Sequence, residues 1–370
     1  MDNKVLLIIG NGFDLHCGLH TSYLDYFNYQ YKNSIGFKLF VNLLKHGNIE
    51  KLDEAFKLLK DEKNITFFDV YFTVQDWNKE LLGTDLTWSN VEDMLLKGFE
   101  GGTSNNLSYH LCFVCYSRLV AYNNTNSYDF DVSYDILGQY LASRFGFNKT
   151  IDESTFNNFL LEELDKFSVN FSKFITKQVE ETPNYITDAQ NFIMKITGHA
   201  LNECIIISFN YTEPLASPSS ANIHGIASKE KIVFGITCGE KEIKQNTHNS
   251  WYYKATKEFK IAKLLANGIK VSANYEGIKD IYVYGSSLGS QDYDFYENLF
   301  EYFEFLMRSN SARIHFCYSV YGNKTREEVA EDLTIKVTNL INKFGDNYKT
   351  YGLLRSMIQK GHLDFLLIDD

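Results

Sequence analysis

Two side chains that can do chemistry on a sugar stand at the ends of predicted strands. Asn210 directly follows the buried run Cys204–Phe209, and His224 follows in the short segment N-I-H-G. A carboxamide can hold a water molecule and a sugar hydroxyl at once, while a neutral imidazole can accept a proton near pH 7. An isolated asparagine or histidine more often caps a turn or fills a core. Their place at two strand ends beside a glycine turn favours a catalytic pair.

The glycine turn ends the first predicted strand, Val5–Ile9, whose uninterrupted apolar run is typical of a parallel strand buried on both faces. Glycines allow a close approach of a ligand to the backbone, and a helix that follows offers N–H groups to a phosphate. Position 15 is Leu where the dinucleotide fingerprint has its third glycine, so an ordinary strand connection stays open beside nucleotide binding. Asp14 has two interpretations, a helix cap and a sugar contact. The residues expected to line the nucleotide are Gly10, Asn11, Gly12, Phe13 and Asp14.

A similar turn follows the predicted strand Ile281–Tyr284. It contains Gly285, Ser286 and Ser287, and Asp292 then precedes a helix. The carboxyl ends of parallel strands lie on one edge of a sheet. We therefore expect both glycine turns and the Asn210 end to converge on a single crevice.

The bulk composition limits the function. With 370 residues and 44% hydrophobic residues, the chain can bury a large core, and the net charge of −11 argues against a nucleic-acid scaffold. The start of the chain shows no leader, and no apolar run approaches the length of a membrane span, so we expect a cytoplasmic protein without a membrane partner. Cys112 and Cys115 lack a second ligand pair, so we expect no metal. The cysteines indicate buried free thiols and are Cys17, Cys112, Cys115, Cys204, Cys238 and Cys317.

Hydrophobic spacing divides the chain into a nucleotide-binding core of residues 1–29 and 199–320, a helical insertion of residues 30–198, and a C-terminal helical segment of residues 321–370. Buried strands alternating with helices predict an α/β fold with a Rossmann-like parallel sheet and helices on both faces. Arg313–Tyr318 is the last strand that we expect. The other predicted elements are helices at Glu54–Leu59, Val91–Phe99, Ser154–Phe174, Ile186–Leu201, Tyr253–Ala266 and Thr325–Phe344, and a strand at Ile232–Ile236.

The segments G-N-G-F-D, T-S-Y, S-F-N-Y-T, N-I-H-G and Y-G-S-S-L-G together resemble the AbiH family of bacterial abortive-infection proteins. Their order also resembles, more distantly, the sirtuin-like fold, in which NAD lies across the sheet edge. That resemblance implies that Asn210 positions ribose or water and that His224 acts as a base. It also implies a dinucleotide site that adds Thr21, Ser22, Tyr23, Gly285, Ser286, Ser287 and Asp292 to the first glycine turn.

Two positions depart from the family pattern. His20 stands where a proline is usual, which affects the loop over the cofactor, and Ser286 stands where a histidine is frequent, which removes a candidate base. A sirtuin deacetylase would also need a paired-cysteine zinc module, so protein deacylation is not expected.

The function that the resemblance implies is antiphage defence by hydrolysis of NAD to nicotinamide and ADP-ribose. The alternative is a non-catalytic nucleotide-binding sensor whose helical insertion binds a partner or a phage component. A nuclease would need clustered acidic metal ligands, which the sequence lacks. NAD or a related nucleotide is the expected ligand, and a phage-derived trigger and a homo-oligomer are candidate partners.

Overall fold

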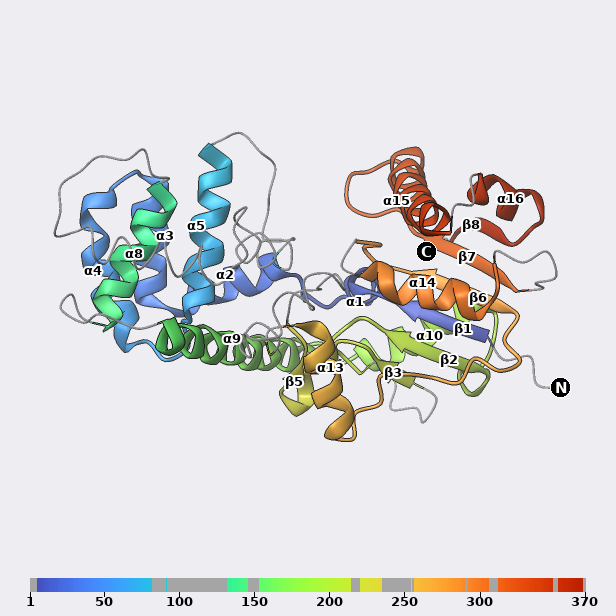
Figure 1. The fold of residues 1–370 in the computed structure, drawn as a ribbon, viewed down its shortest axis with the longest axis horizontal. Coiled ribbons are helices and arrows are strands. Elements are labelled where there is room, and N and C mark those ends of the chain that lie inside the picture. The colour runs from blue at the N-terminus through green and yellow to red at the C-terminus, as the bar shows by residue number, and fades with distance from the viewer. Residues whose placement is uncertain are drawn as a thin grey trace. The chain divides into compact units, whose positions relative to one another are not determined.

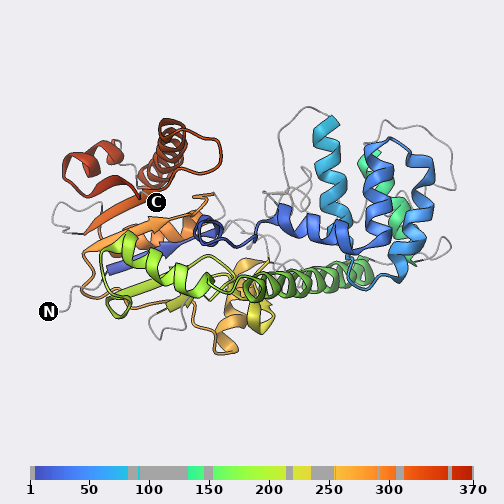
Figure 2. The same cartoon turned by 180° about the vertical axis from the view of Figure 1, so that it is seen from behind.

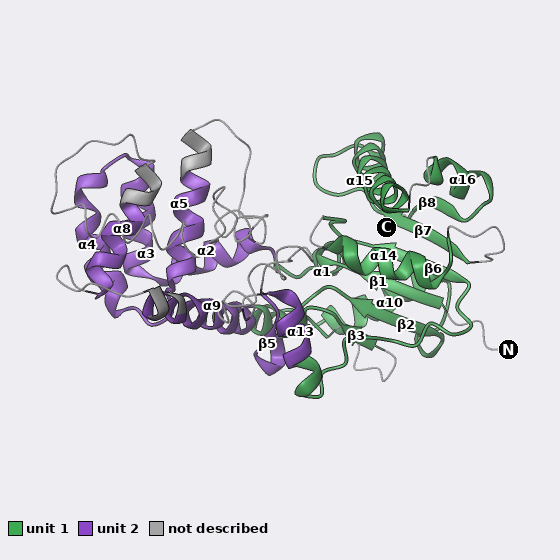
Figure 3. Cartoon of the chain, in the orientation of Figure 1, with its two compact units in different colours: residues 1–21, 175–226, 264–370 green, residues 22–174, 227–263 purple. Residues whose placement is uncertain are grey.

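The computed structural model describes residues 5–81, 91, 132–145, 153–213, 220–234, 254, 256–289, 292–305, 312–348 and 352–368. The chain forms two compact units, which Figure 3 distinguishes by colour. The sheet unit comprises Met1–Thr21, Ile175–Ile226 and Leu264–Asp370, and the helical unit comprises Ser22–Phe174 and Ala227–Lys263. The sheet unit therefore draws on three segments of the chain.

A six-stranded sheet forms the centre of the sheet unit, and every neighbouring pair of its strands is parallel (Figure 1). The strands lie in the order β3-β2-β1-β6-β7-β8. Because the order reverses between β1 and β6, the carboxyl ends of these two strands form the switch point of a doubly wound sheet. The bounds are β1 (Val5–Ile9), β2 (Cys204–Ser208), β3 (Ser220–Asn222), β6 (Asp280–Tyr284), β7 (Arg313–Tyr318) and β8 (Leu363–Leu367).

Helices cover both faces of this sheet. On one face Val5, Leu7 and Ile9 pack with α1 and α10, while Leu6 and Ile8 pack on the other face with α14, α15 and α16. Figures 1 and 2 show α14 and α10 on opposite sides of the strands. Alternate side chains of one strand thus enter two separate cores, as expected for a strand buried on both faces. The helices are α1 (Asn11–His16), α10 (Tyr185–Thr197), α14 (Tyr293–Tyr302), α15 (Arg326–Asn347) and α16 (Leu353–Gln359), with a short η3 (Leu201–Glu203).

The helical unit has an aromatic core. The apolar stripe of α9, from Phe156 to Phe174, is buried, and Tyr26 of α2 packs edge-on against Phe167 and Phe171. The predicted interior face is confirmed. The remaining elements are α2 (Tyr23–Asn33), α3 (Ile35–Lys45), η1 (Ile49–Lys51), α4 (Leu52–Asp61), α5 (Phe67–Leu81), α8 (Val132–Phe145), α9 (Glu153–Glu181), β4 (Gly225–Ile226), η4 (Ala227–Lys229), β5 (Lys231–Ile232) and α13 (Lys257–Ala266).

The parallel sheet with helices on both faces is confirmed, and so are the predicted strand ends. One expectation about the sheet is wrong: Arg313–Tyr318 is not its last strand, because β8 follows and pairs with it. The segment beginning at Ile232 is also shorter than expected, since β5 pairs only with β4 in a separate two-stranded sheet. Val91–Phe99 lies largely outside the described residues. The boundaries of the helical insertion stay a prediction.

The cysteines and the helices give two further findings. Cys17, Cys204 and Cys317 are buried free thiols, as expected, while Cys112, Cys115 and Cys238 lie outside the described residues. No helix in the described part of the chain is long and apolar enough to cross a membrane.

The two glycine turns at the switch point touch each other directly. The Gly10 N–H donates to the Tyr284 carbonyl at 3.0 Å, and the Gly12 N–H donates to the Gly285 carbonyl at 2.9 Å. A Cβ atom on Gly10 would lie 2.5 Å from the Cα of Ser286, and one on Gly12 would lie 2.8 Å from the Cα of Gly285. The glycines are therefore needed where one backbone meets another.

This contact predicts that Gly12→Ala destabilises the protein. Alanine favours the α1 helix over glycine, but the added methyl group must displace backbone, which costs about 1–3 kcal/mol. Gly289→Ala is the matched control, because its Cβ would meet only the Ser287 Oγ at 3.4 Å. Urea unfolding should show a lower free energy of unfolding for Gly12→Ala alone. Equal stability of the two variants would contradict the assigned role.

Candidate functional site

His224 and Asp292 form a pair at the carboxyl edge of the sheet. His224 lies between β3 and β4, and its Nε2 is 3.4 Å from the Asp292 Oδ1 at the start of α14. Both side chains are largely buried, with 9% and 12% of their surface exposed. The Phe209 ring packs edge-on against the imidazole, with ring centroids 5.3 Å apart. Two segments nearly 70 residues apart in the chain thus bring a base and a carboxylate together.

Asn210 adjoins this pair through Phe209 and has an unusual environment. Its side chain is buried, with 3% of the residue exposed, yet neither its oxygen nor its nitrogen has a hydrogen-bond partner among the described residues. The backbone is fixed, since the Asn210 N–H donates to the Ser208 Oγ at 3.1 Å and the Asn222 Nδ2 donates to the Asn210 carbonyl at 3.4 Å. A buried carboxamide without partners costs folding free energy, so it points to a ligand.

Asp14 lies at the centre of a buried polar network. The Tyr185 hydroxyl donates to its Oδ1, and the Thr212 hydroxyl donates to its Oδ2, each at 2.8 Å. The two hydroxyl oxygens are 3.1 Å apart, and the Asn222 Nδ2 donates to the Thr212 carbonyl at 2.8 Å. The network therefore connects α1, α10 and the segments after β2 and β3. Asp14 does not cap α1, whose N-cap is Gly10, and both of its oxygens are engaged inside the protein.

Burial changes the acidity of this network. Desolvation raises the pKa of Asp14 from 3.8 to about 6, although the hydrogen bonds from Thr212 and Tyr185 oppose that rise. Asn210 also lies close enough to lower this pKa slightly, even though its amide makes no hydrogen bond of ordinary geometry. Burial and the Asp14 charge raise the pKa of Tyr185 above its usual range. The carboxyl group thus holds its proton over part of the acidic range.

The other predicted residues have local partners. The Thr21 hydroxyl donates to the Asn11 Oδ1 at 2.7 Å, and the Ser286 Oγ accepts from the Tyr296 hydroxyl at 3.0 Å. The Gly289 N–H donates to the Ser287 Oγ at 3.3 Å. The Phe13 N–H donates to the Gly10 carbonyl at 2.8 Å, and its side chain is in the core. These side chains are adjacent to the switch point, but their partners stabilise turns.

Ser22 and Tyr23 belong to the helical unit. Ser22 is the N-cap of α2 and forms a capping box with Asp25. The Tyr23 ring packs against Phe171 and Phe234, with centroids 5.2 and 5.7 Å apart. In the helical unit they therefore act as a helix cap and a packing residue, and their contact with a nucleotide stays a prediction.

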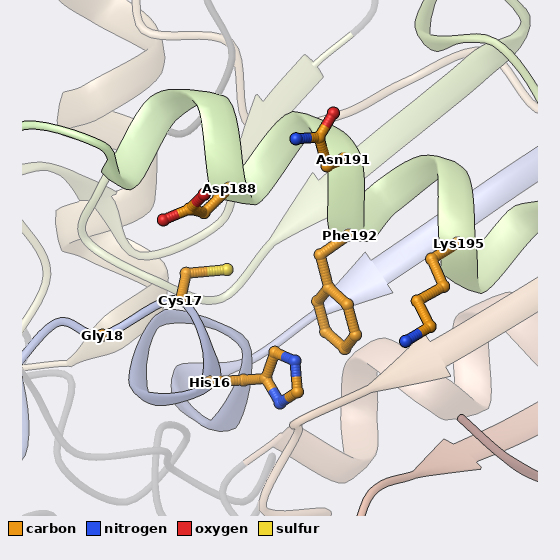
Figure 4. A pocket seen from close by; sticks show the side chains of 7 residues that line it. All are labelled: His16, Cys17, Gly18, Asp188, Asn191, Phe192 and Lys195. Carbon is orange, nitrogen blue, oxygen red and sulfur yellow. The ribbon is translucent and has the colours of Figure 1, made fainter. Parts of the chain in front are cut away.

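A cavity of about 380 Å³ opens beside α1 and α10 of the sheet unit. Figure 4 shows the residues that line it, His16, Cys17, Gly18, Asp188, Asn191, Phe192 and Lys195. The His16 and Phe192 rings stack with centroids 3.8 Å apart, and the His16 Nδ1 is 3.3 Å from the Tyr284 hydroxyl. The sequence analysis placed no ligand here and treated His16 as structural. The polar lining residues are exposed, so helical spacing on α10 was the only signal.

Metal coordination finds no centre in the part of the chain that the structure describes. No group of three or more His, Cys, Asp or Glu side chains there could hold a metal ion. The buried polar groups at the sheet edge are an amide, an imidazole, hydroxyls and two carboxyls. This set is suited to hydrogen bonding and proton transfer.

The fold and this edge define a doubly wound α/β protein with a polar site at the carboxyl ends of its strands. The family model described as Bacteriophage abortive infection AbiH matches residues 6–318, so the chain belongs to the AbiH family. The family indicates a protein of phage abortive infection. Comparison with curated proteins and with solved structures finds no significant match.

The raised pKa of Asp14 predicts how Asp14→Asn changes stability with pH. In the wild type, the contribution of this carboxyl group is fully present below about pH 4 and is lost as the pH rises to about 6, because the unfolded chain ionises first. An asparagine amide can still pair with both hydroxyls but does not ionise. Urea unfolding at pH 4 and pH 7 should show the variant gaining on the wild type by about 3 kcal/mol. A difference that does not change with pH would contradict the buried-acid assignment.

Proposed function

We propose that the protein hydrolyses NAD to nicotinamide and ADP-ribose during phage infection. The observation that carries the proposal is the buried, unpartnered carboxamide of Asn210 next to the His224–Asp292 pair. The strand order supports a dinucleotide ligand, because doubly wound sheets bind ligands where that order reverses. Membership of the AbiH family supports a role in defence.

The reaction assigns one task to each residue. The Asn210 carboxamide holds a water molecule and a ribose hydroxyl, and so satisfies its own oxygen and nitrogen. His224 takes a proton from that water as its oxygen bonds to the ribose carbon C1′. The bond from C1′ to the nicotinamide nitrogen breaks, and its electron pair leaves with nicotinamide. Positive charge on the sugar is the main feature that such a site stabilises.

The glycine contact limits where a diphosphate can bind. The N–H groups of Gly10, Gly12 and Phe13 already donate to carbonyl groups of the protein. A diphosphate therefore contacts side chains near this turn, not these N–H groups. Asn11 is exposed beside Thr21 and is the polar side chain of the turn that remains in reach.

The alternative is a non-catalytic nucleotide-binding sensor. The observation that favours it is the burial of Asn210 and His224, which are only 3% and 7% exposed, so that NAD reaches them only after the edge opens. Titration calorimetry that shows tight nucleotide binding, with no nicotinamide released in the presence of phage lysate, would support this alternative.

The hydrolase proposal predicts that Asn210→Ala separates activity from stability. Because the amide has no partner within the described chain, its loss should change the free energy of unfolding by no more than about 1 kcal/mol. Nicotinamide release should nevertheless fall at least 100-fold, and in His224→Ala as well. The exposed His46, at the end of α3, provides the control variant His46→Ala.

The measurement is nicotinamide release from NAD by purified protein, repeated as NAD content in phage-infected cells that express each variant. Wild type and His46→Ala should both deplete NAD after infection, while Asn210→Ala and His224→Ala should not. Undiminished depletion by both site variants would remove these residues from the reaction.

A further inference from the structure

The position of Asp292 is unusual for an aspartate at the start of a helix. It is the N-cap residue of α14, where an aspartate normally accepts a hydrogen bond from a backbone N–H of the first turn. Its carboxylate makes no such capping bond, although all of α14 is described. Instead its Oδ1 lies 3.4 Å from the His224 Nε2. The carboxylate thus forgoes a stabilising contact with its own helix and faces the imidazole.

The surroundings of the pair restrict the imidazole ring. Phe209 packs edge-on against it, and the Tyr211 ring lies tilted with its centroid 6.1 Å away. Phe209 is itself held by Phe295 of α14, with centroids 5.0 Å apart. The first turn of α14 favours negative charge at Asp292 through the helix dipole. A charged carboxylate therefore faces Nε2 among aromatic rings.

From these contacts we infer that Asp292 is a positioning residue for His224 and not a contact for NAD. This inference rests on the proposed hydrolysis. The carboxylate accepts the Nε2–H hydrogen, which fixes the tautomer and leaves Nδ1 as the base. When Nδ1 takes the proton from water, the Asp292 charge stabilises the imidazolium ion. The separation of 3.4 Å shortens when substrate is bound, as catalytic hydrogen bonds commonly do.

Asp292→Asn tests this role, with Asp294→Asn as the matched control. Asp294 is an exposed carboxylate in the first turn of the same helix, so its variant removes the same charge from α14. A positioning role predicts that kcat for NAD falls about 100-fold in Asp292→Asn while KM changes less than about threefold. Asp294→Asn should match the wild type. A rise in KM with unchanged kcat would instead make Asp292 a ligand contact and overturn the inference.

A second measurement does not depend on activity. Ring ¹⁵N NMR of the histidine-labelled full-length wild type, with His224 identified by the signal missing in His224→Ala, reports its tautomer directly. The inference predicts the Nε2–H tautomer in the wild type and in Asp294→Asn, and a mixture of tautomers in Asp292→Asn. An Nδ1–H tautomer in the wild type would overturn it. If no NAD is hydrolysed, the proposed function fails, but the NMR result still decides whether Asp292 orients His224.

Discussion

The structure of the sheet unit depends on one backbone contact, where the turn after β1 meets the turn after β6. Gly12 donates to the Gly285 carbonyl, and a Cβ atom on Gly285 would lie 2.4 Å from the Phe13 nitrogen. No side chain fits in this space. The contact closes the switch point of the sheet and determines where α1 begins. It therefore also places Asp14 and the other side chains of that helix.

From Asp14 the organisation continues through hydrogen bonds between buried side chains. Tyr185 and Thr212 converge on its carboxylate, and Asn222 fixes the Thr212 carbonyl. A buried network of this kind is stable only when its members are satisfied. Every bond of this network is short, which makes the unpartnered amide of Asn210 at its border more notable. Such a local departure from good folding practice is expected where a protein binds a ligand.

Much of the fold could be predicted because its signals are local. The apolar run before Gly10 indicated a buried strand, and the capping box at Thr325 and Glu328 gave the start of α15. The strand β8 was missed because it is short and lies at the edge of the sheet, where only pairing with β7 identifies it. Edge strands carry weaker hydrophobic patterns, since they are partly exposed.

The site was predictable in its residue types but not in their partners. The sequence brought Asn210, His224 and the glycine turns to one edge, which parallel topology explains. It could not show that the glycines meet each other, or that Asp14 pairs with residues 171 and 198 positions away. It also grouped Asp292 with the nucleotide contacts, whereas the carboxylate lies against His224. Side-chain pairing over such separations leaves no periodic pattern along the chain.

The most direct test of the account is a crystal structure of the inactive His224→Ala protein with NAD bound. The account predicts that the bond between ribose and nicotinamide lies within hydrogen-bonding reach of the Asn210 carboxamide, beside Asp292 and the contact between the two glycine turns. NAD bound only in the cavity between α1 and α10, or with its nicotinamide ribose remote from Asn210, would contradict it.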